Sequence, residues 1–428
     1  MSALVLRNAR LIDPATGRDG PGALLIRDGL IEDVSHDPAP ALPEGAALVD
    51  CGGLPLAPGI VDMRVFVGEP GERHKESYRS AGEAAAAGGV TTICVQPDTA
   101  PPVDDPAVLE FAMRRAEKAS AVRVAPMAAL TKGMKGREMA EYGFLLDAGA
   151  LAFTDASHPV SDPTVFRNCL DYAHSLGALV VHHPQDPAMA AEGCVTESLF
   201  ASMLGLPGVH PFAERIMLER DMALVEITGA RYHADLVTTR GALEALRRAK
   251  ERGLDVSAAV SHHHFTLNEH DLADYPTFFK LDPPLREEED RAAVAEAVAE
   301  GLIDVICSSH RPQDEESKRQ PFEVAAYGAV GLETLLPGAL KLFHDGAMSL
   351  PALFERLSLA PARRLGLPGG RLAKGAPADL VLFDPSVPYV LDRFSLRSKS
   401  KNTPFDRRLM TGRAVRTWVG GREAFRRG

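Results

Sequence analysis

Short apolar segments alternate with helix-like segments through most of this chain, and this alternation restricts the fold more than any other feature. Repeated β/α alternation over roughly 300 residues predicts either a parallel barrel or an open doubly wound sheet. Neither a GxGxxG fingerprint nor a P-loop occurs, which favours the barrel, a (β/α)8 barrel of TIM type over residues 58–366. The clearest helix and strand pairs are Ala81–Ala87 with Gly89–Val95, 163–176 with Ala178–His183, and Arg291–Glu300 with Leu302–Cys307.

The two ends of the chain have a different, β-rich pattern. Between two strand-like segments near the N-terminus lies Asp28-Gly29, a dipeptide typical of a tight hairpin turn. We therefore expect one small β-rich domain built from both ends, residues 1–57 plus 367–428, beside the barrel. Its strand-like segments are Leu4–Arg7, Ala23–Gly29, Ala378–Asp384 and Ala414–Arg422.

Charge and composition exclude several classes of function. The formal net charge of -11 argues against a nucleic-acid or anionic-membrane surface, since both need a basic patch. The five cysteines have no CxxC spacing, which indicates a reducing compartment. The N-terminus has no charged and apolar leader pattern, and no apolar run approaches 18 residues. The sequence thus predicts a cytoplasmic protein whose partners are small molecules or other proteins.

One motif at the start of the predicted barrel connects the chain to a known family. Residues 58–71 read PGIVDMRVFVGEPG. This run resembles the opening strand of the dihydroorotases, members of the amidohydrolase superfamily, whose pattern is PG-hydrophobic-VD-x-HxH-LR-x-PG. Side chains two apart on a strand face the same side, so both histidines of HxH point into the barrel mouth and bind zinc. Here those positions hold Arg64 and Phe66, which cannot ligate zinc, because guanidinium stays protonated and phenylalanine has no lone pair.

The resemblance extends over nearly the whole chain. Matches at so many ordered segments identify the chain as a member of the dihydroorotase family and imply the amidohydrolase barrel. The matching runs are Lys75-Glu76, AGGVTT at 87–92, QPDT at 96–99 where the family has MPNT, AEG at 191–193, FKLDPPLR at 279–286, GLET at 331–334 and SKSKNTPF at 398–405.

The resemblance implies a zinc site, in which metal-bound hydroxide attacks a cyclic amide with the help of a carboxylate. Six positions carry that chemistry in the family, and only His183, in VHHPQD, keeps its residue here. One imidazole does not hold zinc, which needs three protein ligands and a water. The five replaced positions are Arg64 and Phe66 for the histidine pair, Ala156 for the second aspartate of F-S/T-D-D, Leu236 for the second histidine of YHxxHxST, and Ser309 for the aspartate of ATDHAPH.

The positions implied for substrate binding have changed as well. The arginine of HLR is Gly68, the asparagine of MPNT is Asp98, and the asparagine of NPPLR is Asp282. An anionic substrate would therefore lose its arginine and meet two carboxylates, a reversal of sign that opposes binding. We expect no catalytic residue, with Ser309 and His310 left as vestigial positions, and no metal cofactor.

Arg64 has two interpretations. It is either a relocated catalytic cation or a plug whose fixed charge fills the vacated metal position, and we favour the plug because a buried arginine needs a carboxylate partner. We predict that Arg64 pairs with Asp155 or Glu69. Phe66 is expected to fill the core.

A rebuilt metal site is the alternative to a lost one. Its ligands would come from Asp155, His182, His183, His263, His264 and His310, and zinc would then be the cofactor. We expect most of these histidines to be structural. In His262-His263-His264, consecutive strand residues would alternate faces, so at most two could share a centre.

These interpretations of the site residues lead to three alternative functions. The first is a noncatalytic scaffold partner of an aspartate transcarbamoylase, because some transcarbamoylases of pyrimidine biosynthesis assemble with a dihydroorotase-like subunit, active or inactive. The second is an active cyclic amide hydrolase with a rebuilt metal site. The third is a metabolite sensor without turnover. A homodimer is expected in each case, because amidohydrolase barrels commonly pair.

Overall fold

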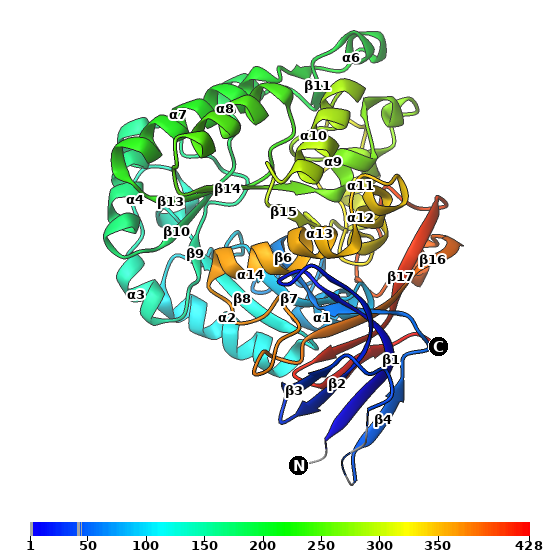
Figure 1. Ribbon diagram of the computed structural model, residues 1–428. Helices are drawn as coiled ribbons and strands as arrows, with labels where there is room; N and C mark the ends of the chain where they lie inside the picture. The colour runs from blue at the N-terminus through cyan, green and yellow to red at the C-terminus, as the bar shows by residue number, and fades with distance from the viewer. Residues whose placement is uncertain (1–2, 41–42, 44) are drawn as a thin grey trace.

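The centre of the molecule is a barrel of eight parallel strands (Figure 1), which confirms the predicted fold class. The computed structural model describes residues 3–40, 43 and 45–428. In the sheet, the strands run in the order β15-β14-β13-β10-β9-β8-β7-β6. They are β6 (Ile60–Val65), β7 (Val90–Val95), β8 (Arg123–Ala128), β9 (Ala152–Phe153), β10 (Leu179–His182), β13 (Arg231–Ala234), β14 (Val256–Ser261) and β15 (Val305–Cys307).

The first and last barrel strands meet just beyond their ends, where they nearly close the barrel. The backbone N–H of Phe66 donates to the carbonyl of His310 at 2.9 Å, and that of His310 donates to the carbonyl of Arg64 at 3.2 Å. Every residue of β6, β7, β10 and β14 is buried, as expected for parallel strands covered on both faces.

Helices cover the outside of the barrel (Figure 1). Several begin with a side-chain cap, for example Asp105 before α2 and Asp162 before α4, each followed by proline at the first helical position. The helices are α1 (Tyr78–Ala87), α2 (Pro106–Ala119), α3 (Tyr142–Asp147), α4 (Pro163–Ser175), α5 (Pro187–Ala190), α6 (Leu199–Leu204), α7 (Phe212–Thr228), α8 (Arg240–Glu251), α9 (His262–Thr266), α10 (Glu288–Glu300), α11 (Glu315–Lys318), α12 (Leu335–His344), α13 (Leu350–Phe354) and α14 (Ala360–Leu365).

Shorter helical turns and one small sheet lie in the loops. The excursion after β10 contains α5, α6 and a two-stranded sheet, and it places α6 at the top of the molecule in Figure 1. The remaining elements are η1 (Lys132–Met134), η2 (Glu269–Leu272), η3 (Thr277–Phe279), the π-helical turn η4 (Glu355–Leu359), η5 (Arg393–Ser395), β11 (Val195–Thr196) and β12 (Gly208–Val209).

Strands from both ends of the chain form a second sheet beside the barrel. Its order is β18-β17-β16-β5-β1-β2-β3, with β4 paired to β1, so the terminal segments share one hydrogen-bonded surface. Asp28 and Gly29 both have positive φ, 53° and 81°, as the predicted hairpin turn requires. The strands are β1 (Leu4–Asp13), β2 (Arg18–Arg27), β3 (Leu30–Ser35), β4 (Ala47–Asp50), β5 (Pro55–Pro58), β16 (Leu380–Val390), β17 (Leu409–Val419) and β18 (Arg422–Arg426).

None of the helices in the described part of the chain is both long enough and apolar enough to cross a membrane.

Candidate functional site

The residues singled out from the sequence gather where the barrel strands end. In a parallel barrel all carboxyl ends meet at one face, which is where such folds bind their ligands. Arg64 lies on β6, and Asp155, His183, Asp235 and His310 follow β9, β10, β13 and β15.

The guanidinium of Arg64 fills this mouth. The Arg64 side chain is 5% exposed; its Nη1 forms an ion pair with Asp235, which is 3% exposed. Its Nη2 donates to Ser157 Oγ at 2.9 Å. Gln96 Nε2 donates to the same Asp235 carboxylate at 3.2 Å. Burial lowers the pKa of Arg64, but arginine stays charged in proteins, so Asp235 faces a fixed cation.

The prediction that Arg64 pairs with Asp155 or Glu69 was wrong, because its partner is Asp235. Asp155 accepts hydrogen bonds from the backbone N–H groups of Leu130 and Thr131, each at 2.9 Å, so the loop after β8 occupies its carboxylate. Glu69 binds Arg115 at 2.8 Å on the outer side of the mouth. Sequence reasoning missed Asp235, because this residue stands at a variable position of the family motif YHxxHxST.

The aromatic ring of Phe66 and the vestigial residue Asp98 hold a second arginine. Arg311 lies over the Phe66 ring, with 5.0 Å between the guanidinium carbon and the ring centre, and its Nη1 donates to Asp98 Oδ2 at 2.6 Å. Phe66 is buried and therefore fills space while it also supports a cation. Asp98 is thus occupied by a residue of the same protein.

The other two positions implied for substrate binding are Gly68 and Asp282. A Cβ atom added to Gly68 would lie 2.4 Å from the carbonyl oxygen of Glu72, so no side chain fits there without a backbone shift. Asp282 accepts a hydrogen bond from Gln185 Nε2 at 3.0 Å and lies 3.6 Å from His183 Nε2. Burial by itself would raise the pKa of Asp282, but His183 and Arg64 hold it below its usual range.

Three of the replaced ligand positions keep a strained backbone. Ala156, Leu236 and Ser309 have φ angles of 53°, 72° and 48°, in the left-handed region that is rare for residues other than glycine. Such conformations gather at functional sites. Leu236 is buried in an apolar cluster with Val61 and Val181. The three positions therefore share a left-handed backbone where β9, β13 and β15 end.

Each histidine proposed for a rebuilt metal site has a polar neighbour at one ring nitrogen at least, but His183 Nε2 and His310 Nε2 are buried without a hydrogen-bond partner among the described residues. His182 Nδ1 lies 2.7 Å from Asp221 Oδ2, and its Nε2 accepts from the backbone N–H of Val160 at 3.0 Å. His310 Nδ1 accepts from the backbone N–H of Gly331, and its Nε2 lies 3.4 Å from Glu76.

The three consecutive histidines lie on helix α9, whereas the sequence predicted a strand. They turn to different neighbours: His262 Nε2 lies 3.0 Å from Thr334 Oγ1, His263 Nδ1 2.8 Å from Ser261 Oγ, and His264 Nε2 2.9 Å from the carbonyl of Pro283. Burial lowers the pKa of His264 to about 4, so its ring is neutral at pH 7. The buried atoms His263 Nε2 and His264 Nδ1 have no hydrogen-bond partner.

The residues at the mouth do not fit the zinc ion that the family implies. Across residues 3–40, 43 and 45–428, no group of three or more His, Cys, Asp or Glu side chains is placed to hold a metal. A permanent cation, Arg64, lies among the side chains that line the cavity. That cavity has a volume of only about 10 Å³, room for about one water molecule.

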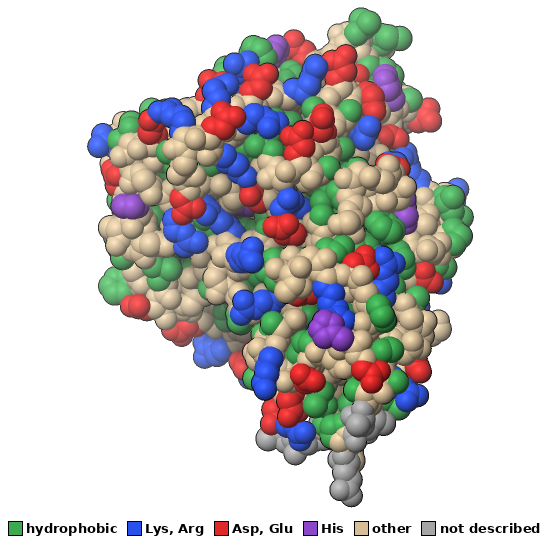
Figure 2. Space-filling view, in the orientation of Figure 1, with side chains coloured by type: hydrophobic (Ala, Val, Ile, Leu, Met, Phe, Trp, Pro, Cys, Tyr) green, Lys and Arg blue, Asp and Glu red, His purple; other side chains and the backbone are tan. Residues whose placement is uncertain are grey.

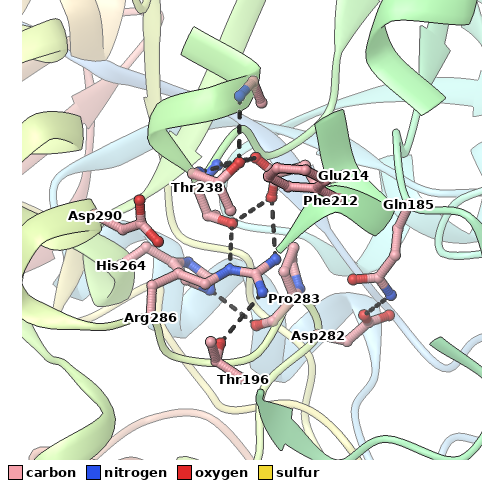
Figure 3. Close-up of polar contacts among 12 residues, drawn as sticks. Gln185, Thr196, Phe212, Glu214, Thr238, His264, Asp282, Pro283, Arg286 and Asp290 are labelled. Atoms are coloured by element: carbon pink, nitrogen blue, oxygen red, sulfur yellow. Dashed lines mark hydrogen bonds and ion pairs between the residues drawn. The ribbon is translucent and has the colours of Figure 1, made fainter. Parts of the chain in front are cut away.

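A neighbouring cluster shows a buried ion pair in which every polar atom is matched (Figure 3). Arg286 donates through Nη2 to Glu214 at 3.2 Å and through Nε to Thr238 Oγ1 at 3.0 Å. Its Nη1 donates to Thr196 Oγ1 at 3.2 Å. Glu214 also accepts from the backbone N–H groups of Thr238 and Thr239 at 2.8 and 2.9 Å. The sequence marked Arg286 only as part of the run FKLDPPLR.

Comparisons with known proteins agree with this fold. A family model described as Dihydro-orotase-like matches residues 53–242. A protein named dihydroorotase from Anaeromyxobacter dehalogenans is 41% identical over 98% of this chain and 97% of its own length. Another of that name, from Anaplasma phagocytophilum, is 41% identical over 98% of this chain and 94% of its own. Among solved structures, the L-hydantoinase (dihydropyrimidinase) of Arthrobacter aurescens superposes with a TM-score of 0.90 at 25% identity, covering 100% of this chain and 97% of that one.

Proposed function

The chain belongs to the dihydroorotase family, and from that premise we propose that it is a noncatalytic member that serves as a structural partner of an aspartate transcarbamoylase. The observation that carries the proposal is the ion pair of Arg64 with Asp235 at the end of the barrel. It supports loss of catalysis for two reasons, one electrostatic and one steric.

The electrostatic reason concerns the cation. A divalent ion among these residues would lie beside a guanidinium that cannot lose its proton, so the two like charges repel in a medium of low dielectric. Of the six positions that carry the family's chemistry, His183 alone keeps a ligand, and its Nδ1 already lies 3.3 Å from the carbonyl of Asp235.

The steric reason concerns the substrate. Arg64, Gln96, Asp282 and Arg311 line a cavity of about 10 Å³. A ring-shaped cyclic amide needs many times the volume of a single water.

Metal content and turnover test the loss of catalysis. Protein purified without added zinc is expected to hold zinc far below one equivalent and to leave dihydroorotate unhydrolysed. A second sample, incubated with zinc and then desalted, shows whether the metal was simply lost during purification. One equivalent of retained zinc together with hydrolysis would refute the proposal.

Assembly with the transcarbamoylase of the same organism tests the scaffold role. We expect the two proteins to elute as one complex from gel filtration at micromolar concentration. Two separate peaks would contradict the partnership but would leave the loss of catalysis standing.

An active cyclic amide hydrolase is the second candidate, favoured by the structural likeness to an L-hydantoinase. It would need Asp155, His182, His183, His263, His264 and His310 to converge, whereas Asp155 and His182 are bound to other groups. Zinc-dependent hydrolysis of a hydantoin or dihydropyrimidine ring would support this candidate. Melting-temperature shifts with pyrimidine metabolites, without turnover, would instead support a sensor.

A further inference from the structure

The sheet built from the two ends of the chain finishes in an open edge strand. β18 is the last strand in the order of this sheet, and its one hydrogen-bonded neighbour among the described residues is β17. No backbone hydrogen bond joins residues 422–426 to any other described segment. An open edge of this kind presents unpaired N–H and C=O groups, which can pair with the backbone of another chain.

The register of β17 and β18 shows which backbone groups face the open edge. The N–H of Arg427 donates to the carbonyl of Val415 at 2.8 Å, so these two residues form a hydrogen-bonded pair. Hydrogen-bonded and non-hydrogen-bonded pairs alternate along an antiparallel ladder. Arg426 and Arg416 form the next pair, so the N–H and C=O of Arg426 point away from β17. One donor and one acceptor are therefore available at this position.

A large groove lies beside the first half of β18. It has a volume of about 1350 Å³, and residues of both β18 and helix α2 line it. The amino-terminal ends of β7 and β8 also reach the groove, so it lies at the opposite end of the barrel from the mouth around Arg64. Its apolar lining residues include Val61, Met113, Leu151 and Leu367. A segment that pairs with β18 can therefore bury apolar side chains there.

The C-terminal part of the chain carries unbalanced positive charge. Residues 393–428 contain eleven Lys or Arg and two Asp or Glu, whereas residues 1–392 contain 36 Lys or Arg and 56 Asp or Glu. Over α7 and α8, acidic and basic side chains are interspersed (Figure 2), and Arg252 there pairs with Glu226. The C-terminal strands lack such a balance, so their surface favours a negatively charged partner.

The positive charge on β18 lies next to the open edge. Arg426 is exposed and, within the described part of the chain, makes no ion pair. Glu423, the acidic residue of this strand, already pairs with Arg416 at 3.5 Å. Arg416 also lies directly opposite Arg426, and like charges in that position repel each other. An acidic side chain beside these two arginines would offset the repulsion.

The two faces of β18 favour different side chains on an added strand. Phe425 packs against the core, whereas Arg426 next to it is exposed, as expected for side chains that alternate along a strand. On the inner side, the groove is lined by charged residues that form no ion pair with described residues and whose charges cancel, namely Glu110, Arg114, Glu117 and Arg422. The groove thus favours apolar side chains, and the outer face favours acidic ones.

We propose that the open edge of β18 binds an extended segment of a partner protein in which acidic and apolar residues alternate. The segment adds a strand to the sheet, so that main-chain hydrogen bonds supply affinity and alternate side chains supply specificity. Its apolar side chains enter the groove, and its acidic side chains lie beside Arg416 and Arg426. Nucleic acid fits this edge less well, because the guanidinium of Arg427 lies 5.2 Å from the centre of the Phe425 ring and covers it against stacking with a base.

Binding of a synthetic peptide tests the proposal. The probe is a short fluorescent peptide of alternating glutamate and valine, and its dissociation constant is measured by fluorescence anisotropy. The matched control is a peptide of alternating lysine and valine, which should bind at least about 10-fold more weakly because its charges meet Arg416 and Arg426. Equal binding of the two peptides, or of an oligothymidylate with the same net charge as the probe, would overturn the proposal.

Two substitutions of one residue separate backbone pairing from charge. Arg426→Ala removes the charge and keeps the N–H, whereas Arg426→Pro removes both. The proline variant should bind the glutamate–valine peptide about 5-fold more weakly than the alanine variant, since one backbone hydrogen bond is lost. Arg137→Ala removes an exposed cation from the loop after β8, at the other end of the barrel, and should leave the affinity unchanged. Equal affinities of the two Arg426 variants would contradict strand addition.

Hydrogen exchange of the natural chain gives a readout that needs no variant. The Arg426 amide should exchange freely in the protein alone and become protected when the glutamate–valine peptide is added. An amide that stays unprotected at saturating peptide would overturn the proposal. So would protection without peptide in a sample whose sedimentation gives the mass of two chains, because a second copy would then occupy the edge.

Discussion

Two buried arginine–carboxylate pairs lie near the barrel mouth, and their surroundings differ. Around Arg286 and Glu214, each side-chain nitrogen and oxygen has a partner, and threonines supply most of them (Figure 3). Around Arg64 and Asp235, buried polar atoms stay unmatched, among them Asp62 Oδ2, His263 Nε2 and His264 Nδ1.

This difference in hydrogen bonding indicates that the two sites have different roles. Burying a polar atom without a partner costs free energy, so a site that serves stability alone has its atoms matched. The Arg286 pair meets that description. The mouth around Arg64 keeps unmatched atoms and the left-handed backbone at Ala156, Leu236 and Ser309. We infer that the mouth around Arg64, unlike the Arg286 pair, does not serve stability alone.

Breaking the matched pair should have the largest effect. Arg286→Met leaves Glu214 buried and without its cation, so the free energy of unfolding should fall by about 3–5 kcal/mol. Urea denaturation measures the change. Arg252→Met is the control, because Arg252 pairs with Glu226 at the exposed surface. This substitution should lower the free energy of unfolding by less than about 0.5 kcal/mol. Equal losses in the two variants would remove the contrast.

Asp62, beneath the mouth, should show the next largest effect and a pH dependence. Burial raises its pKa to about 6 in the folded protein, from 3.8 in the unfolded chain. The unfolded chain loses this proton first, so the natural protein loses up to about 3 kcal/mol of stability as the pH rises from about 4 to 6.

Asp62→Asn should not lose stability over this pH range, because an amide does not titrate. Its oxygen can still accept from the backbone N–H groups of Arg64 and Ser308, and its NH2 group takes the place of the unmatched oxygen. The measurement is the difference in unfolding free energy between the two proteins at pH 4 and pH 8. The free energy of unfolding of Asp62→Asn should rise relative to that of the natural chain between pH 4 and pH 8. A constant difference would show that Asp62 is ionised throughout.

The mouth pair should be dispensable when both partners are removed together. Arg64→Met/Asp235→Asn should change the unfolding free energy by no more than about 1 kcal/mol, because no charge is left buried alone and Asn can still accept from Gln96. Arg286→Met/Glu214→Gln should remain strongly destabilised, since Glu214 also binds two backbone N–H groups. If both double variants lose the same stability, the two sites are equivalent.

The smallest effect concerns the retained backbone. Ala156→Gly relieves a positive φ but removes a buried methyl group, so the two contributions should cancel to within about 0.5 kcal/mol. Ala152→Gly in strand β9 removes the same methyl group from a regular backbone and should cost about 1–2 kcal/mol. Thermal unfolding of the pair measures the contrast, and an equal cost would show that position 156 is not strained.

Part of the site was predictable because its meaning lies in residue identity alone. The side chains of Arg64, Phe66, Ala156 and Leu236 offer no lone pair to a zinc ion, and no fold changes that chemistry. The partner of Arg64 was not predictable in this way. Asp155, Glu69 and Asp235 are equally acidic in the sequence, and only the loop after β8, which holds Asp155 through Leu130 and Thr131, leaves Asp235 for Arg64.

The three histidines show the same limit. Residues 262–264 extend a buried strand, and nothing local distinguishes a continued strand from the short helix that Ser261 caps. By itself, the sequence determined the barrel, the turn at Asp28-Gly29 and the replacement of the family's first histidine pair by Arg64 and Phe66, because these depend on periodicity and residue identity. The tertiary structure alone decided which carboxylate neutralises Arg64 and how little space remains at the mouth, because these depend on distances between residues far apart in the chain.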